Sequence, residues 1–234
     1  MQINSGKLYW KYKSKINKIY PYLTHDVKAD VLVIGGGIAG ALTTYFLAKE
    51  GANVVTVEKN IIGYGNTIAD TAALEYQFES EMSKLEKIIG KKRTARMYKL
   101  CLDSISKIEN INKEFKMPTG FLRQDNIYFT NRFMQRGAVA REFEERKKSG
   151  FDAVYIDSHS LVNLNSGIVT RNASAIMNPY SFTQGLFEYL DTMENVKIFE
   201  NTKIDDIKCR IDEVECKTNN NFKIISDKVV MASG

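Results

Sequence analysis

The stretch that most constrains the fold of this chain is Asp30-Val-Leu-Val-Ile-Gly-Gly-Gly-Ile-Ala-Gly40. Val31 to Ile34 predict a buried parallel strand. Gly35, Gly37 and Gly40 follow with the G-x-G-x-x-G spacing that opens the helix of a dinucleotide-binding βαβ unit. Gly35 makes the tight turn, Gly37 leaves space for a pyrophosphate, and Gly40 lets the helix pack closely on the strand. Phosphates are then expected at the helix N-terminus, where N–H groups and the helix dipole favour anions.

An acidic residue completes this unit. Asn53 to Val57 predict the second strand, and Glu58 follows it where a carboxylate can accept hydrogen bonds from a ribose diol. The glycine triplet alone would admit NAD. Three features favour FAD: the unit lies near the N-terminus, a loop of small residues follows Glu58 directly, and an apolar strand returns much later, before Ala232-Ser-Gly234.

A membrane helix is the alternative for Val31 to Ala48, an uncharged run just long enough to be considered. The run contains four glycines, two threonines and a tyrosine, and it begins immediately after an acid. The polar segment before it is longer than the short basic region of a signal peptide. We therefore predict neither a transmembrane segment nor a signal peptide.

The composition excludes several other classes. A chain of 234 residues, 44% hydrophobic and 26% charged, is ordinary for a globular protein of one or two domains. His25 and His159 are the only histidines, and Cys101, Cys209 and Cys216 lack metal-ligand spacing, so we predict no metal site. An odd number of scattered cysteines suits reduced thiols, which predicts a cytoplasmic protein.

The net charge of +5 is partly local, because five lysines fall between Lys7 and Lys18 among several aromatic residues. Such a mixture can bind nucleic acid through phosphate contacts and stacking. The alternative is an amphipathic arm whose aromatic residues dock on the domain while its lysines remain solvated. No recognised nucleic-acid motif accompanies the lysines, so we prefer the arm and predict no nucleic-acid partner.

Hydrophobic periodicity and turn residues divide the remainder into helices and strands. The expected helices are residues 38–50, 81–89, 93–115, 133–148 and 181–193. The expected strands are 120–130, 153–156, 173–177, 196–199 and 228–231, with a small β-meander over 204–225. In the helix over 93–115, one apolar stripe of Met97, Leu100, Ile105, Ile108, Ile111 and Phe115 is expected to face the core.

The N-terminal unit, the Gly63-x-Gly65-x-Thr67 loop and the closing Val229-Val-Met-Ala-Ser-Gly234 together resemble the FAD-dependent oxidoreductases of the D-amino-acid oxidase superfamily. That superfamily includes glycine oxidase, sarcosine oxidase and glycerol-3-phosphate dehydrogenase. Leu8-Tyr-Trp10, Tyr20-Pro-Tyr-Leu23 and the loop over 62–67 are most similar to bacterial members that often carry a C-terminal Rieske domain. The resemblance covers essentially the whole chain from residue 30.

The resemblance implies an α/β fold: a Rossmann-like, glutathione-reductase-like FAD-binding domain of the GR2 type with an inserted α+β substrate domain. The implied divisions are an arm over residues 1–29, a discontinuous FAD-binding domain over 30–115 and 180–234, and part of the substrate domain over 116–179. Because the family continues well past the closing turn, we expect a C-terminally truncated portion. Strands near 120–130 and 173–177 are then expected to lack partners.

The resemblance also implies the cofactor-binding residues, matched position by position. The residues so implied are Gly35, Gly37, Ile38, Ala39, Gly40, Glu58, Lys59, Gly65, Asn66, Thr67, Thr71, Ala72, Ala73, Leu74, Ile204, Ala232 and Gly234. Ser233 stands where the family has threonine and keeps the hydroxyl. Ile68-Ala-Asp70 stands where members that act on carboxylates often have an arginine. No catalytic residue can be assigned, since the chain shows no nucleophile–base or paired-carboxylate constellation.

The leading functional hypothesis is an FAD-dependent oxidoreductase that oxidises a C–N bond of a small amine or amino acid by hydride transfer to flavin N5. A second is a dehydrogenase of a hydroxy substrate of the glycerol-3-phosphate or 2-hydroxy acid type. A third is a non-catalytic FAD-binding or electron-relay module, and a fourth is a truncated chain that is inactive by itself. The expected partners are the small substrate and an electron acceptor, for which a C-terminal Rieske domain is a candidate.

Overall fold

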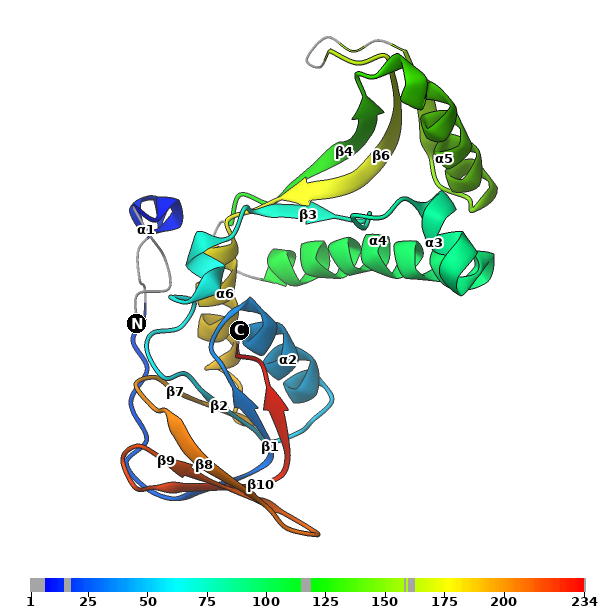
Figure 1. Cartoon of the computed structure of the whole chain (residues 1–234). Helices are drawn as coiled ribbons and strands as arrows, with labels where there is room; N and C mark the ends of the chain where they lie inside the picture. Colours follow the sequence, from blue (N-terminus) through cyan, green and yellow to red (C-terminus); the bar gives the residue numbers. More distant parts are fainter. Residues whose placement is uncertain (1–6, 15–17, 115–118, 158, 160–162, 234) are drawn as a thin grey trace. The chain divides into compact units, whose positions relative to one another are not determined.

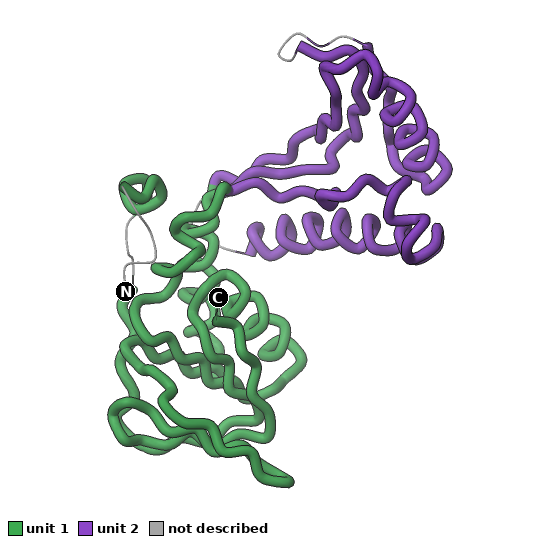
Figure 2. The backbone as a smooth tube through the Cα atoms, viewed as in Figure 1, with its two compact units in different colours: residues 1–71, 115–119, 178–234 green, residues 72–114, 120–177 purple. Residues whose placement is uncertain are grey.

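The computed structural model of this chain describes residues 7–14, 18–114, 119–157, 159 and 163–233. The chain forms two units (Figure 2). Unit 1 comprises residues 1–71, 115–119 and 178–234, and unit 2 comprises residues 72–114 and 120–177. Unit 2 is therefore inserted into the sequence of unit 1, as the resemblance implies for a substrate domain.

The division between the units differs from the predicted one. Residues 72–114 were expected in the nucleotide-binding domain, but they belong to unit 2. The reason is that α4 (Lys91–Glu114) packs against the strands of the second sheet, and α3 (Met82–Ile89) packs on α4. The predicted arm over 1–29 also ends earlier, because strand β1 already begins at Val27.

Unit 1 is built on a six-stranded sheet with the order β7-β2-β1-β10-β9-β8 (Figure 1). Its strands are β1 (Val27–Ile34), β2 (Val54–Val57), β7 (Val196–Phe199), β8 (Ile204–Cys209), β9 (Val214–Thr218) and β10 (Lys223–Met231). Strands β7, β2, β1 and β10 run parallel to one another. Strands β9 and β8 extend the sheet beyond β10 as an antiparallel ribbon. The end of the expected meander over 204–225 and the expected strand over 228–231 form one continuous strand, β10.

Two helices of unit 1 pack against each other, α2 (Ile38–Lys49) and α6 (Pro179–Leu190). Every residue of β2 is buried, and Thr56 on β2 shares a hydrogen bond of 2.7 Å between hydroxyls with Thr44 on α2. Helix α6 begins two residues before the predicted start, because the Asn178 side chain accepts the backbone N–H of Ser181 and Pro179 occupies the first turn.

Unit 2 contains a smaller antiparallel sheet. Its strands are β3 (Ala73–Glu75), β4 (Leu122–Thr130), β5 (Ala153–Ile156) and β6 (Ser166–Ile176). The expectation that strands near 120–130 and 173–177 lack partners is wrong, since β4 pairs with β6, and β6 also pairs with β3 and β5. Helices α4 and α5 (Arg136–Lys148) pack against this sheet. Short helices α1 (Tyr9–Lys13), η1 (Asn66–Ala69) and η2 (Phe133–Gln135) complete the described elements.

The apolar stripe of α4 is only partly as expected. Ile105 and Ile111 are buried, but Leu100 is exposed, and Phe115 lies outside the described residues. Tyr98, outside the predicted stripe, is buried among Tyr76, Met82 and Phe151. An ion pair also joins α4 to the sheet. Arg123 of β4 donates through Nε to Glu109 Oε2 of α4 at 2.8 Å.

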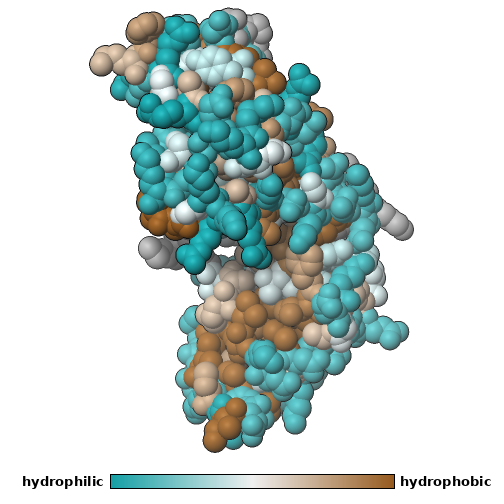
Figure 3. Space-filling model, turned by 90° about the vertical axis from the view of Figure 1, so that its right-hand side faces the viewer, coloured by the Kyte–Doolittle hydropathy of each residue, from teal (hydrophilic) through white to brown (hydrophobic). Residues whose placement is uncertain are grey.

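Apolar side chains also lie at the surface of unit 1. Figure 3 shows an apolar area on one face of the lower part of the molecule. Phe46 on α2 and Met231 at the end of β10 are 47% and 60% exposed, and Ile211 in the turn between β8 and β9 is fully exposed. None of the helices in the described part of the chain is long and apolar enough to cross a membrane.

Candidate functional site: the carboxyl ends of the parallel strands

The three glycines of the motif differ in what requires them. Gly35 has a φ of +124°, and a Cβ there would lie 2.7 Å from the backbone of Ala232. A Cβ on Gly40 would lie 1.8 Å from the carbonyl oxygen of Gly35, so close helix–strand packing requires glycine. Gly37 is different, because its φ is −80° and a Cβ would meet only Thr67 Oγ1, at 3.2 Å. The backbone conformation at Gly37 suits any residue, and a Cβ there would require only the Thr67 side chain to shift by a few tenths of an ångström.

Gly37 is the residue immediately before helix α2, whose first intrahelical bond runs from Ala41 N–H to Gly37 C=O at 2.9 Å. The N–H groups of the first turn therefore lack intrahelical acceptors. Thr67 Oγ1 accepts one of them, from Ile38, at 3.1 Å. Ala39, in the same turn, is exposed. The predicted site residues Gly37, Ile38, Ala39 and Thr67 thus come together at one helix N-terminus.

Glu58 immediately follows β2, as predicted, and its carboxylate accepts hydrogen bonds from the backbone. Its Oε2 accepts the N–H of Gly36 and its Oε1 accepts the N–H of Asn60, both at 2.8 Å. A Cβ on Gly36 would lie 2.7 Å from Ile62 and 2.8 Å from Glu58, so this glycine permits the close contact. Each carboxylate oxygen has a second lone pair, so Glu58 can still accept a hydroxyl. The sequence did not assign a role to Gly36.

Two residues that the sequence analysis missed fix the start of the loop after β2. Glu200 is fully buried, and its Oε1 accepts the backbone N–H of Ile62 at 2.7 Å. Gln184 on α6, also buried, donates through Nε2 to the Ile62 carbonyl oxygen at 2.7 Å. Both peptide groups of Ile62 are therefore held, and the chain leads from there to Gly65 and Thr67. The position of Glu200 directly after the apolar pair Ile198-Phe199 was the available signal, and Gln184, between Thr183 and Gly185, gave none.

The closing turn lies beside the glycine motif. Parallel pairing of β10 with β1 brings Met231 opposite Ile34, and the N–H of Ala232 donates to the Ile34 carbonyl oxygen at 2.8 Å. Ala232 contacts Gly35 as described above. Ser233 is exposed, and Gly234 lies outside the described residues. Segments separated by about two hundred residues therefore lie side by side, because the parallel strands β1 and β10 end at the same edge of the sheet, next to the N-terminus of α2.

The remaining predicted cofactor residues fall in three places. Lys59, Gly65, Asn66 and Thr71 lie in unit 1, where Gly65 immediately precedes η1 and the other three side chains are exposed. Ile204 begins β8 and packs against the core of unit 1. Ala72, Ala73 and Leu74 belong to unit 2, where β3 pairs with β6. Ala72 has a φ of +72°, a backbone conformation rare for residues other than glycine.

The residues at this edge fit a dinucleotide on the evidence of their geometry. Gly37 leaves the helix N-terminus uncovered by any Cβ, and first-turn N–H groups there suit a pyrophosphate. Glu58 offers a carboxylate at the end of the next strand. Within the described residues no group of three or more His, Cys, Asp or Glu side chains is arranged to hold a metal ion.

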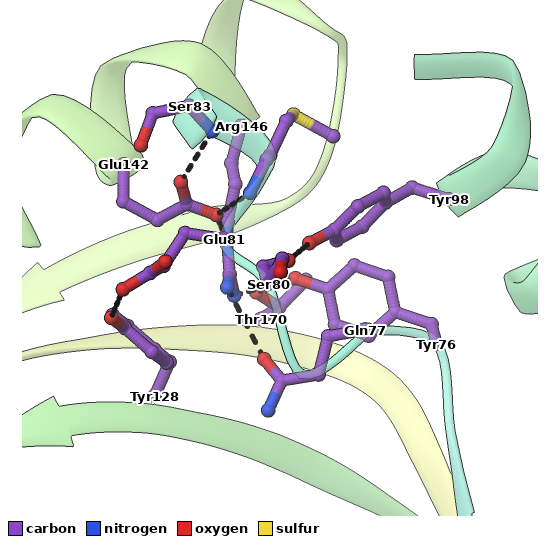
Figure 4. Close-up of polar contacts among 11 residues, drawn as sticks. Tyr76, Gln77, Ser80, Glu81, Ser83, Tyr98, Tyr128, Glu142, Arg146 and Thr170 are labelled. Atoms are coloured by element: carbon purple, nitrogen blue, oxygen red, sulfur yellow. Dashed lines mark hydrogen bonds and ion pairs between the residues drawn. The ribbon is translucent and has the colours of Figure 1, made fainter. Parts of the chain in front are cut away.

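A second polar cluster lies inside unit 2 (Figure 4). Arg146 on α5 is 1% exposed, and its guanidinium donates to Glu142 Oε1 at 3.0 Å, Tyr76 Oη at 2.7 Å and Gln77 Oε1 at 3.2 Å. It also lies over the ring of Tyr128, 5.2 Å from the centroid. Every acceptor within its reach is a side chain of unit 2, so this arginine supports the fold rather than a ligand.

Glu142 connects this cluster to helix α3. Its two carboxylate oxygens accept the N–H groups of Met82 and Ser83 at 3.0 and 2.9 Å, which satisfies the N-terminus of that helix. Burial raises the pKa of Tyr128 to about 12, so its hydroxyl stays protonated and donates to Glu81 Oε1 at 3.0 Å. The cluster is a closed set of donors and acceptors that joins α3, α5 and the sheet.

A profile of the FAD-dependent oxidoreductase family matches residues 30–234, which is most of the chain. The chain belongs to this family of FAD-dependent oxidoreductases. The family assignment confirms the predicted Rossmann-like α/β class and confirms FAD as the cofactor.

Solved structures agree with the fold. Glycine oxidase from Geobacillus kaustophilus superposes with a TM-score of 0.71 at 20% identity, over 90% of this chain and 56% of that one. L-amino acid deaminase from Proteus myxofaciens gives a TM-score of 0.72 at 17% identity, over 94% and 49% of the two chains. A curated relative from Bacillus subtilis, named a putative Rieske 2Fe-2S iron-sulfur protein (YhfW), is 27% identical over 86% of this chain and 39% of its own length. The chain thus spans about half, or less, of these relatives.

Proposed function

We propose that the protein containing this chain binds FAD at the carboxyl edge of the unit 1 sheet and oxidises a C–N bond of a small amine or amino acid. The observation that carries the proposal is the site at Gly37, where the backbone conformation does not itself require glycine and the missing Cβ leaves room for a pyrophosphate at the start of α2. Membership of the family supports the cofactor, and the named activities of the two structural relatives support the substrate class.

In this proposal the pyrophosphate rests against Gly37 and the first-turn N–H groups of Ile38 and Ala39. Glu58 accepts the hydroxyls of the adenosine ribose while retaining the Gly36 N–H, which keeps its carboxylate oriented. Thr67 donates its hydroxyl hydrogen to the diphosphate while its oxygen continues to accept from Ile38.

The outer residues of the proposed site meet the other parts of the cofactor. The backbone of Ile204 would meet adenine, Lys59 is the residue beside Glu58, and Gly65 and Asn66 would contribute donors to the diphosphate and ribityl chain. The family resemblance assigns Thr71, Ala72, Ala73 and Leu74 to the segment that would accompany the isoalloxazine, and it assigns Ala232 and Gly234 to the closing turn, of which Gly234 lies outside the described residues.

The bound flavin supplies the redox chemistry by accepting a hydride at N5. The described residues of this chain would bind and orient the cofactor, and we assign none of them as catalytic. The Rieske name of the Bacillus subtilis relative supports an iron–sulfur electron acceptor, and the free cysteines support a cytoplasmic location.

The test uses the full-length protein. Acid extraction should release FAD, and anaerobic addition of glycine, proline and other amino acids or small amines should bleach the visible absorption of the oxidised flavin. Bleaching by glycerol 3-phosphate or 2-hydroxy acids instead would establish the alternative substrate class. FAD that no member of either panel reduces would contradict the catalytic proposal and favour an electron-relay module.

A further inference from the structure

The N-terminal segment packs against the loop that follows β2. Helix α1 contacts η1, and the indole N–H of Trp10 donates to the backbone carbonyl oxygen of Asp70 at 2.9 Å. The ammonium group of Lys11 lies over the Tyr64 ring, 5.6 Å from its centroid. Ser14 accepts a hydrogen bond from Asn178 Nδ2 at 2.7 Å. The expected docking of the aromatic residues holds for Trp10, whereas Tyr9 and Tyr12 are 59% and 70% exposed.

The other half of the segment reaches the same loop from its opposite end. The N–H of Tyr20 donates to Glu200 Oε2 at 3.1 Å, while Glu200 Oε1 accepts the N–H of Ile62. The Leu23 N–H donates to Thr202 Oγ1 at 3.1 Å, which continues the attachment. One buried carboxylate therefore joins the N-terminal segment to the first residues of the loop.

We propose that residues 8–14 and 18–23, here named the clasp, position the loop over residues 61–70 for FAD binding. The clasp is attached near both ends of the loop, at Ile62 through Glu200 and at Asp70 through Trp10. Between these attachments lies Thr67, whose hydroxyl holds the Ile38 N–H at the start of α2. The clasp acts through the loop, so Trp10 is a positioning residue and not a catalytic one.

The clasp restricts the loop before the cofactor arrives, because each of its contacts exists among protein groups alone. A pre-ordered loop loses less conformational entropy when the cofactor binds, and the benefit appears chiefly as slower release. This inference rests on the proposed FAD site. Its test therefore includes a measurement on the protein without FAD.

The decisive comparison is Trp10→Phe against Tyr12→Phe in the full-length protein. Each variant keeps an aromatic ring on α1 and removes one polar hydrogen, but only Trp10 donates to the loop at Asp70. Hydrogen exchange of the apoprotein should accelerate in peptides covering residues 61–70 for Trp10→Phe alone, by about two- to tenfold for one lost hydrogen bond. Peptides covering β8 and β9 should not change, and neither should the thermal unfolding midpoint.

The same pair of variants then tests the consequence for FAD. Stopped-flow release of FAD should accelerate by about two- to tenfold in Trp10→Phe and remain at the wild-type rate in Tyr12→Phe. Ser14→Ala, which keeps the chain's single tryptophan, should give a weaker effect of the same kind together with a change in tryptophan emission. Unchanged loop exchange in Trp10→Phe would overturn the clasp even where FAD binds normally, as would faster exchange without faster release. Failure of the wild-type protein to bind FAD would instead overturn the proposed function.

Discussion

Gly37→Ala and Gly40→Ala separate what the fold requires from what the cofactor requires. A Cβ on Gly40 would begin 1.8 Å from the Gly35 carbonyl oxygen, and ordinary contact needs about 3.4 Å, so the helix must move away from the strand. Overpacking of this kind typically costs about 1–3 kcal/mol and more where backbone must shift. We therefore expect Gly40→Ala to lose at least about 3 kcal/mol of unfolding free energy.

Gly37→Ala is expected to behave in the opposite way. Its φ of −80° suits any residue, and the new methyl group meets only Thr67 Oγ1 at 3.2 Å, so the apoprotein should unfold within about 1 kcal/mol of wild type. The methyl group would hold the pyrophosphate away from the helix N-terminus. Losing two hydrogen bonds to a charged group, at about 1.5–3 kcal/mol each, weakens FAD by roughly 3–6 kcal/mol, which is a 10²- to 10⁴-fold rise in Kd.

Urea unfolding of the apoproteins, followed by far-ultraviolet circular dichroism, and titration with FAD together provide the assay. Gly137→Ala, in helix α5 of unit 2, is the matched control, because its Cβ would meet only Arg141 at 3.8 Å. That variant should bind FAD as wild type does and be slightly more stable. Wild-type FAD affinity in Gly37→Ala would refute the proposed pyrophosphate position, and wild-type stability in Gly40→Ala would refute the packing argument.

Three further outcomes are expected. Arg146→Met should lower the unfolding free energy by about 3–5 kcal/mol, because Glu142 would remain buried without its cation. The double variant with Glu142→Leu should lose less unfolding free energy than the two single variants combined, which urea unfolding can measure. The hydrogen bond that Arg123 donates lowers the pKa of the Glu109 carboxyl. The pair therefore stabilises the fold above pH 4.5 and ceases to do so as acid protonates the carboxyl. The stability difference between wild type and Glu109→Gln should shrink as the pH falls below 4.5. Burial raises the pKa of Cys216 to about 11, so a thiol reagent at pH 8 should label exposed Cys209 in the native protein and reach Cys216 only after unfolding, a result that peptide mass spectrometry can check.

The βαβ unit could be predicted because its signals are local. A buried strand, a glycine triplet and a terminal acid follow one another within one short segment, and the structure forms β1, α2 and β2 from them. Strand β6 shows the limit of this reasoning. Only its last residues were predicted, since Arg171 and Asn172, the latter with a φ of +50°, interrupt the apolar pattern of Ser166–Ile176. Pairing with β3, β4 and β5 overrides that weak local preference.

The candidate site was incompletely predicted for a related reason: its supporting acids bind backbone groups. The Glu58 carboxylate accepts hydrogen bonds from the N–H groups of Gly36 and Asn60, and the Glu200 carboxylate accepts those of Tyr20 and Ile62. A backbone donor carries no side-chain signature, so the partner of such an acid cannot be read from residue types. A buried carboxylate must nevertheless be hydrogen-bonded, because leaving it unpaired costs several kcal/mol. An acid that directly follows a buried strand, such as Glu200 after Val196–Phe199, therefore predicts that a distant segment will bring its N–H groups there.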